Sequence, residues 1–93
     1  MRELHAIVHG RVQGVSFRFN ALFEARRLDI KGWVKNRPDG TVETAAAGSQ
    51  AALEAYLDWL RQGPPGSTVT KVEADWRETA QEYASFEILY GTD

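Results

Sequence analysis

Cysteine is absent from the 93-residue sequence, which excludes disulfide bonds, thiolate metal sites and a catalytic thiol. A long apolar run is absent as well. No stretch approaches the roughly 18 consecutive apolar residues of a membrane span. Glu3 and His5 interrupt the N-terminal segment where a signal peptide would need an apolar stretch. We therefore expect a cytoplasmic protein that does not enter a membrane.

The sequence also lacks a basic excess. It has 11 lysine and arginine residues against 13 aspartate and glutamate residues, a formal net charge of −2 at pH 7. Proteins that coat nucleic acid usually carry a positive surplus, so we expect no nucleic-acid partner. Any anion that the protein binds must be held by donors gathered at one place.

Short apolar runs separated by glycine, proline and polar clusters predict five strands. The first follows from the run LHAIV and the others from similar alternating segments. Before the third strand, the sequence RPDG combines proline with Asp-Gly, which favours a tight hairpin turn. The expected strands span residues 4–8, 32–36, 41–48, 69–77 and 85–90.

Apolar residues at helical spacing predict two helices. The first helix would turn Phe19, Leu22 and Phe23 toward the core. The second would follow Ser49 as its N-cap and end at GPPG, where proline cannot donate the hydrogen bond that continues a helix. Its apolar stripe comprises Leu53, Tyr56, Leu57 and Leu60.

The predicted order is therefore β-α-β-β-α-β with a short last strand. Two helices that are each apolar on one side need a shared surface to cover, and an antiparallel sheet with both helices on one face supplies it. We expect a ferredoxin-like α/β sandwich, of the α+β class, in which residues 1–93 form a single stand-alone domain. This fold carries many functions and decides none of them.

The stretch GRVQGVSFR, residues 10–18, connects the first strand to the first helix. Such a turn leaves backbone N–H groups unpaired beside the positive end of the helix dipole, which favours an anion. Gly14 permits a close backbone approach, and Arg18 offers a planar charged fork to two phosphate oxygens. There is no Gly-Lys-Ser/Thr and no nearby acid to hold magnesium, so the residues favour a small phosphate group held without metal. By themselves they also fit an ordinary turn with a solvated arginine.

Together with GWVKNRPDGTVETAAAG, this stretch resembles the acylphosphatase family. The family shares a Gly-x-Val-Gln-Gly-Val-x-Phe-Arg loop and a Gly-x-Val-x-Asn-x-x-Asp-Gly-x-Val segment, and the resemblance covers nearly all of the chain. The matching residues are Gly10, Val12, Gln13, Gly14, Val15, Phe17 and Arg18, then Gly32, Val34, Asn36, Asp39, Gly40 and Val42.

The resemblance implies an enzyme that hydrolyses small-molecule acyl phosphates to a carboxylate and inorganic phosphate, without metal or cofactor. By position, Arg18 would bind the phosphate and Asn36 would orient the attacking water. Backbone N–H groups of the loop would complete the phosphate site, which comprises Gln13, Gly14, Val15, Ser16, Phe17 and Arg18. We expect a monomer.

Three other interpretations remain open from the residues. The chain could be a non-catalytic phosphate-binding or regulatory module on the same fold, or a domain of a larger enzyme. It could also be an RNA-binding domain, although the positions of His5, Ile7 and His9 do not supply the aromatic residues that this needs. His5 and His9 share one strand face but lack a third ligand nearby, so we expect no metal site.

Overall fold

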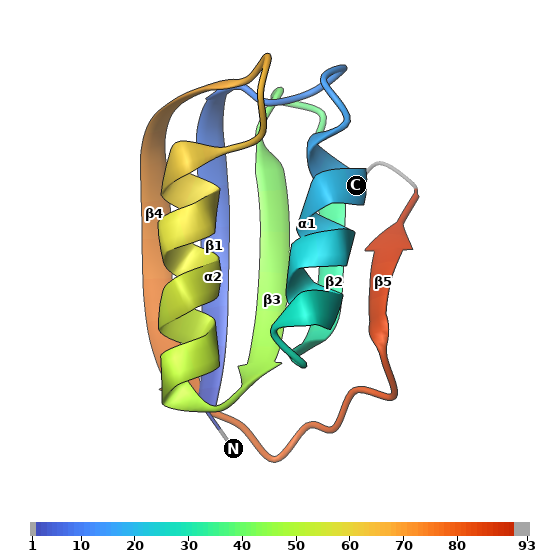
Figure 1. Cartoon of the computed structure of the whole chain (residues 1–93), viewed down its shortest axis with the longest axis vertical. Coiled ribbons are helices and arrows are strands. Elements are labelled where there is room, and N and C mark those ends of the chain that lie inside the picture. Colours follow the sequence, from blue (N-terminus) through green and yellow to red (C-terminus); the bar gives the residue numbers. More distant parts are fainter. Residues whose placement is uncertain (1, 91–93) are drawn as a thin grey trace.

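Seven elements follow one another along residues 2–90, the part of the chain that the computed structural model describes (Figure 1). They confirm the predicted order of strands and helices, including the short last strand. The elements are β1 (Arg2–Arg11), α1 (Phe17–Arg27), β2 (Lys31–Asn36), β3 (Val42–Gly48), α2 (Gln50–Gln62), β4 (Thr68–Glu78) and β5 (Phe86–Leu89).

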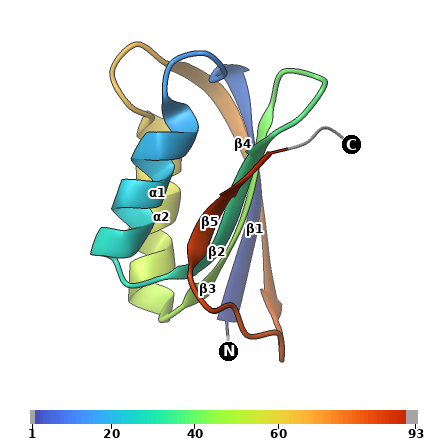
Figure 2. The same ribbon diagram turned by 90° about the vertical axis from the view of Figure 1, so that its right-hand side faces the viewer.

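The strands form one five-stranded sheet in the order β4-β1-β3-β2-β5. β1, β2, β3 and β4 pair antiparallel, as predicted, but β5 pairs parallel with β2. The prediction of a wholly antiparallel sheet is therefore wrong, and the complete sheet is mixed. Both helices lie on one face of this sheet, and the other face is left uncovered (Figure 2). The arrangement confirms the ferredoxin-like α+β class. α1 lies against β2 and β5, and α2 lies against β1, β3 and β4.

The core lies between the helices and the sheet. Every second residue of β1 from Leu4 to Val8 is buried because side chains alternate across a strand. The predicted stripe of α2 is buried as expected, and Ser49 caps this helix by accepting a hydrogen bond from the backbone nitrogen of Ala52 at 3.2 Å. Neither helix of residues 2–90 is long and apolar enough to cross a membrane.

The predicted buried face of α1 is wrong for its two phenylalanines. Phe19 and Phe23 are 51% and 64% exposed. The buried residues are instead Phe17, Ala21 and Ala25, which are four positions apart and therefore share one helix face. The small alanines let the helix backbone approach the sheet closely. Periodicity located the helix, but the size of its apolar side chains did not indicate which face the sheet would cover.

A tight turn joins β2 to β3, as the sequence RPDG predicted. The backbone nitrogen of Arg37 donates to the carbonyl oxygen of Thr41 at 2.9 Å, and that of Gly40 donates to the carbonyl oxygen of Arg37 at 3.1 Å. Asp39 Oδ1 accepts from the hydroxyl of Thr41 at 2.6 Å and from its backbone nitrogen at 3.0 Å. These two hydrogen bonds hold the pKa of the Asp39 carboxyl below its usual value. The turn fixes the end of β2, where Asn36 lies.

Candidate active site

The loop between β1 and α1 crosses one end of the sheet and contributes most of the candidate site. β1 and β2 are not neighbours, since β3 lies between them. The loop leaves the end of β1, passes the start of β3 and enters α1, which lies over β2 (Figure 1). This path brings the start of α1 to the end of β2, although the strands that lead to the two places are not paired.

A cavity of about 280 Å³ lies where the loop meets the end of β2. It brings together Arg18 and Asn36, the two residues for which the family resemblance implies a role in the chemistry. Of the other predicted loop residues, Gln13 and Val15 do not line it, and Val15 packs against the core instead. The lining residues are Val12, Gly14, Ser16, Phe17, Arg18, Phe19 and Asn36.

The backbone of this loop is shaped to offer N–H groups. Gly14 and Ser16 have left-handed backbone conformations, with φ of 76° and 60°. Ser16 occupies the N-cap position of α1, yet its side chain makes no capping hydrogen bond, and the first turn of the helix contains no acidic residue. The N–H groups of a helix's first turn have no partner within the helix. They and the helix dipole therefore favour an anion in the cavity.

Arg18 lies at the start of α1 with its guanidinium group over the ring of Tyr90. The guanidinium carbon is 5.1 Å from the ring centroid, a distance at which the cation is attracted to the aromatic face. This contact occupies no conventional hydrogen-bond acceptor, so the guanidinium N–H donors remain available to a ligand. The sequence did not indicate this contact, because Tyr90 follows β5 and lies 72 positions away (90 − 18).

Asn36 is the last residue of β2 and is paired with Val42 of β3. Its side-chain oxygen Oδ1 is buried and accepts no hydrogen bond from the described residues. Buried polar atoms in proteins are nearly always paired, so an unpaired acceptor beside a cavity requires an explanation. An N–H or O–H donor that enters the cavity, such as water, would satisfy it.

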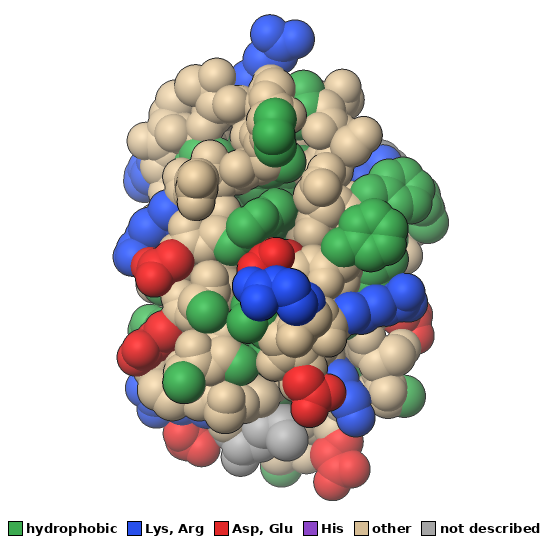
Figure 3. Space-filling view, viewed as in Figure 1, with side chains coloured by type: hydrophobic (Ala, Val, Ile, Leu, Met, Phe, Trp, Pro, Cys, Tyr) green, Lys and Arg blue, Asp and Glu red, His purple; other side chains and the backbone are tan. Residues whose placement is uncertain are grey.

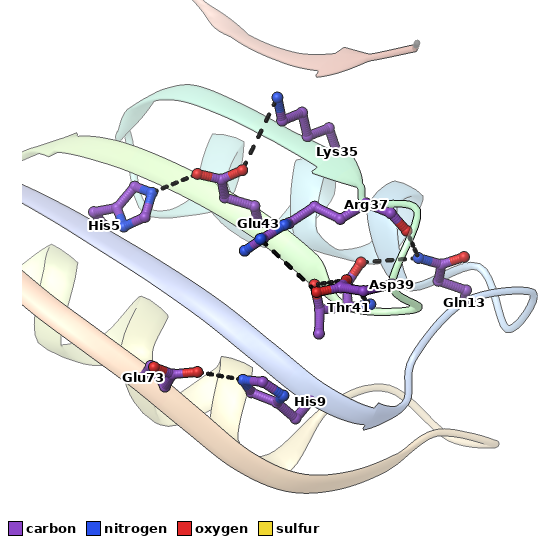
Figure 4. A network of polar contacts seen from close by, with 9 residues as sticks. All are labelled: His5, His9, Gln13, Lys35, Arg37, Asp39, Thr41, Glu43 and Glu73. Atoms are coloured by element: carbon purple, nitrogen blue, oxygen red, sulfur yellow. Dashed lines mark hydrogen bonds and ion pairs between the residues drawn. The ribbon is translucent and has the colours of Figure 1, made fainter. Parts of the chain in front are cut away.

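Gln13 connects the loop to the turn that follows Asn36. Its side-chain nitrogen Nε2 donates to the carbonyl oxygens of Arg37 and Thr41, both at 2.8 Å (Figure 4). The sequence predicted only a backbone role for Gln13, and this side-chain role was missed. The available signal was an amide side chain within the otherwise apolar run VQGV, which indicates a specific partner without identifying it.

Replacing Gln13 by leucine is expected to lower the free energy of unfolding by about 1–2 kcal/mol, because two hydrogen bonds are lost while each carbonyl keeps one backbone partner. Urea unfolding measures this change. Gln50→Leu is a suitable control, since Gln50 is exposed on α2 and its amide contacts only Glu54 among the described residues. Equal stability of the two variants would contradict the bridging role of Gln13.

The two histidines are each paired with a carboxylate on the uncovered face of the sheet (Figure 4). His5 Nε2 lies 2.6 Å from an oxygen of Glu43, and His9 Nε2 lies 2.5 Å from an oxygen of Glu73. The hydrogen bond from His9 is the largest cause of a lowered pKa at Glu73. Within residues 2–90, no group of three or more histidine, aspartate or glutamate side chains could hold a metal ion.

A second, larger cavity of about 570 Å³ lies at the opposite end of the molecule, beside the connection between β4 and β5. Its charged side chains are Asp29, Lys31 and Glu82, two acids and one base. This balance does not suit a phosphate group. The smaller cavity, with an arginine and a helix N-terminus, is the one that can bind a small oxyanion.

The chain matches known proteins over nearly its whole length, both in sequence and in fold. The family model described as Acylphosphatase matches residues 4–88. The acylphosphatase of Anaeromyxobacter dehalogenans is 48% identical over 84 residues, which cover 90% of each chain. The crystal structure of acylphosphatase from Bacillus subtilis matches with a TM-score of 0.94 at 39% identity, covering 97% of this chain and 100% of that one.

The same fold also occurs within a much longer chain. The crystal structure of full-length HypF in the phosphate- and nucleotide-bound form matches with a TM-score of 0.85 at 28% identity, covering 99% of this chain and 12% of that one. The matches to family model and relatives show that this chain belongs to the acylphosphatase family. It is a hydrolase of the carboxyl–phosphate bond of acyl phosphates.

Proposed function

We propose that Arg18 and Asn36 carry out this hydrolysis together, Arg18 by holding the phosphate group and Asn36 by orienting the attacking water. The observation that carries the proposal is their meeting in one cavity of about 280 Å³, although β1, which leads into the loop before Arg18, and β2, which ends at Asn36, are separated by β3 in the sheet. Backbone N–H groups of Gly14, Ser16, Phe17 and Arg18, the predicted loop residues that line the cavity, would complete the phosphate site. We propose a monomer as the active species.

Phosphate binding would depend on the positive charge of Arg18 and on the arrangement of N–H donors around the cavity. A guanidinium group offers two parallel N–H donors to two oxygens of one phosphate, and the first residues of α1, whose N–H groups have no partner within the helix, line the same cavity. The contact of Arg18 with Tyr90 would restrict the guanidinium group before the substrate arrives. Preorganised donors of this kind stabilise the charge that spreads over the phosphate oxygens during transfer.

The reaction itself requires little acid or base strength from the protein. The water oxygen forms a bond to phosphorus, the bond between phosphorus and the acyl oxygen breaks, and the carboxylate leaves with the electron pair. Asn36 would accept a hydrogen bond from the water through Oδ1 and so hold it in line. An amide is too weak a base to take the proton, so the proton passes to an oxygen of the transferred phosphate, and the products are a carboxylate and inorganic phosphate.

Residues 1–93 would then constitute one domain of this family, acting in the cytoplasm on small-molecule acyl phosphates and independently of nucleic acid. The net charge of −2 supports a site that attracts its anionic substrate locally rather than over a wide basic surface. In this mechanism no step requires a metal ion, because Arg18 and the loop N–H groups stabilise the negative charge of the phosphate.

Hydrolysis of benzoyl phosphate in the presence of EDTA tests the proposal. The purified chain is expected to release benzoate and phosphate far faster than the spontaneous reaction, at a rate that EDTA does not change. A rate that EDTA abolishes and magnesium restores would contradict metal independence. A folded chain that binds inorganic phosphate without any turnover would be a phosphate-binding module instead.

A further inference from the structure

Large hydrophobic side chains are exposed beside the cavity. The structure leaves Phe19 and Phe23 of α1, together with Leu89 and Tyr90 at the end of β5, between 38% and 71% exposed. Figure 3 shows hydrophobic side chains gathered on the side of the molecule where α1 begins and β5 ends. Contiguous apolar surface of this kind on a small protein commonly marks a place where something binds.

Phe19 alone among these four residues lines the cavity that contains Arg18 and Asn36. It follows Arg18 directly, and successive residues of a helix point about 100° apart. The phenyl ring therefore forms a wall beside the phosphate position rather than part of that position. Tyr90 is already engaged by the guanidinium of Arg18, whereas Phe19 makes no ring contact with another described residue.

An acyl phosphate has two parts, a charged phosphate and an acyl group. The loop and Arg18 suit the phosphate. The carbonyl carbon of the acyl group must then lie just outside the phosphate site, within reach of the residues that line the cavity mouth. A half-exposed phenyl ring at that place gains free energy by burying its remaining surface against an apolar or aromatic group. A methyl or amino group covers much less of the ring.

We propose that Phe19 is the acyl-binding wall of the site and that it makes the enzyme prefer acyl phosphates with an aromatic or bulky apolar acyl group over acetyl phosphate. The inference rests on the proposed function, because it takes the position of the phosphate from Arg18 and Asn36. The contact forms with the ground state and the transition state alike, so its loss raises KM more than it lowers kcat.

The test compares benzoyl phosphate with acetyl phosphate in the unaltered chain, in Phe19→Ala and in Phe23→Ala. Phe23 is a matched control, since it is one turn further along the same exposed face and does not line the cavity. The ratio of kcat/KM for benzoyl phosphate to that for acetyl phosphate is expected to fall about 3- to 10-fold in Phe19→Ala. In Phe23→Ala the ratio should remain that of the unaltered chain.

A ratio that Phe19→Ala leaves unchanged, or that both variants lower equally, would overturn the inference. Binding of phenacylphosphonate and acetonylphosphonate, in which a methylene replaces the bridging oxygen, provides a second measurement that needs no hydrolysis. Loss of the preference for phenacylphosphonate in Phe19→Ala would support the acyl-binding wall even if the chain proved inactive. Equal binding of the two phosphonates by the unaltered chain would overturn the wall and leave the proposed hydrolysis standing.

Discussion

Replacing Arg18 by glutamine is expected to lower kcat/KM for benzoyl phosphate by about 100- to 1,000-fold or more while the fold remains intact. Glutamine keeps a polar side chain at the start of α1 but lacks the positive charge and the forked donors that match two phosphate oxygens. The positive charge is lost at the proposed phosphate position, where most of the negative charge of the substrate lies. Steady-state hydrolysis of benzoyl phosphate, with the spontaneous rate subtracted, measures the change.

Arg26→Gln is the matched control for this variant. It removes the same charge from the same helix, but Arg26 is exposed near the other end of α1 and does not line the cavity. Its activity should remain close to that of the unaltered chain, and both variants should unfold within a few degrees of it because neither side chain is buried. Activity of Arg18→Gln within about threefold of that of the unaltered chain would refute the phosphate-binding role, since a lost charge contact of this kind costs far more.

Replacing Asn36 by alanine is expected to lower kcat by about 100-fold or more while inorganic phosphate still binds. The substitution removes the acceptor that would hold the water in line, and loss of such positioning is costly to the reaction. It leaves Arg18 and the loop N–H groups in place, so the anion keeps its partners. Because Oδ1 accepts no hydrogen bond from the described residues, its removal should cost the fold little.

Competitive inhibition by phosphate, or calorimetric titration where turnover is too low, separates the two roles of the site. Asn36→Ala should bind phosphate with an affinity close to that of the unaltered chain, whereas Arg18→Gln should bind it much more weakly. Asn36→Asp keeps the size of the side chain and adds a negative charge, and we expect it to weaken phosphate binding by repulsion. Weak phosphate binding by Asn36→Ala would instead place Asn36 in the phosphate site.

Local patterns in the sequence were enough to predict the elements and their order. The apolar stripe of α2, from Leu53 to Leu60, could be predicted because its large apolar residues recur at the helical period and all face the core. The hairpin turn could be predicted because Pro38, Asp39 and Gly40 strongly favour turn conformations. The two motifs that carry the family resemblance are likewise contiguous, so the resemblance proposes roles for Arg18 and Asn36 without any knowledge of distant contacts.

Long-range packing decided the rest. Which face of α1 is buried depends on how closely the helix approaches β2 and β5, and the alanine face was chosen over Phe19 and Phe23 because small side chains permit the closer approach. Three features of the site join distant parts of the chain: the meeting of Arg18 with Asn36 past β3, the hydrogen bonds of Gln13 and the stacking of Arg18 on Tyr90.

The amino-acid sequence alone was therefore sufficient for the elements and their order, because these depend on residues close together in the chain. Its two contiguous motifs also carried the family resemblance from which the roles of Arg18 and Asn36 are proposed. Which groups share the cavity, and which phenylalanine of α1 lines its exposed side, followed only once the chain was folded. These features depend on the order of the strands in the sheet and on the path of one loop across it.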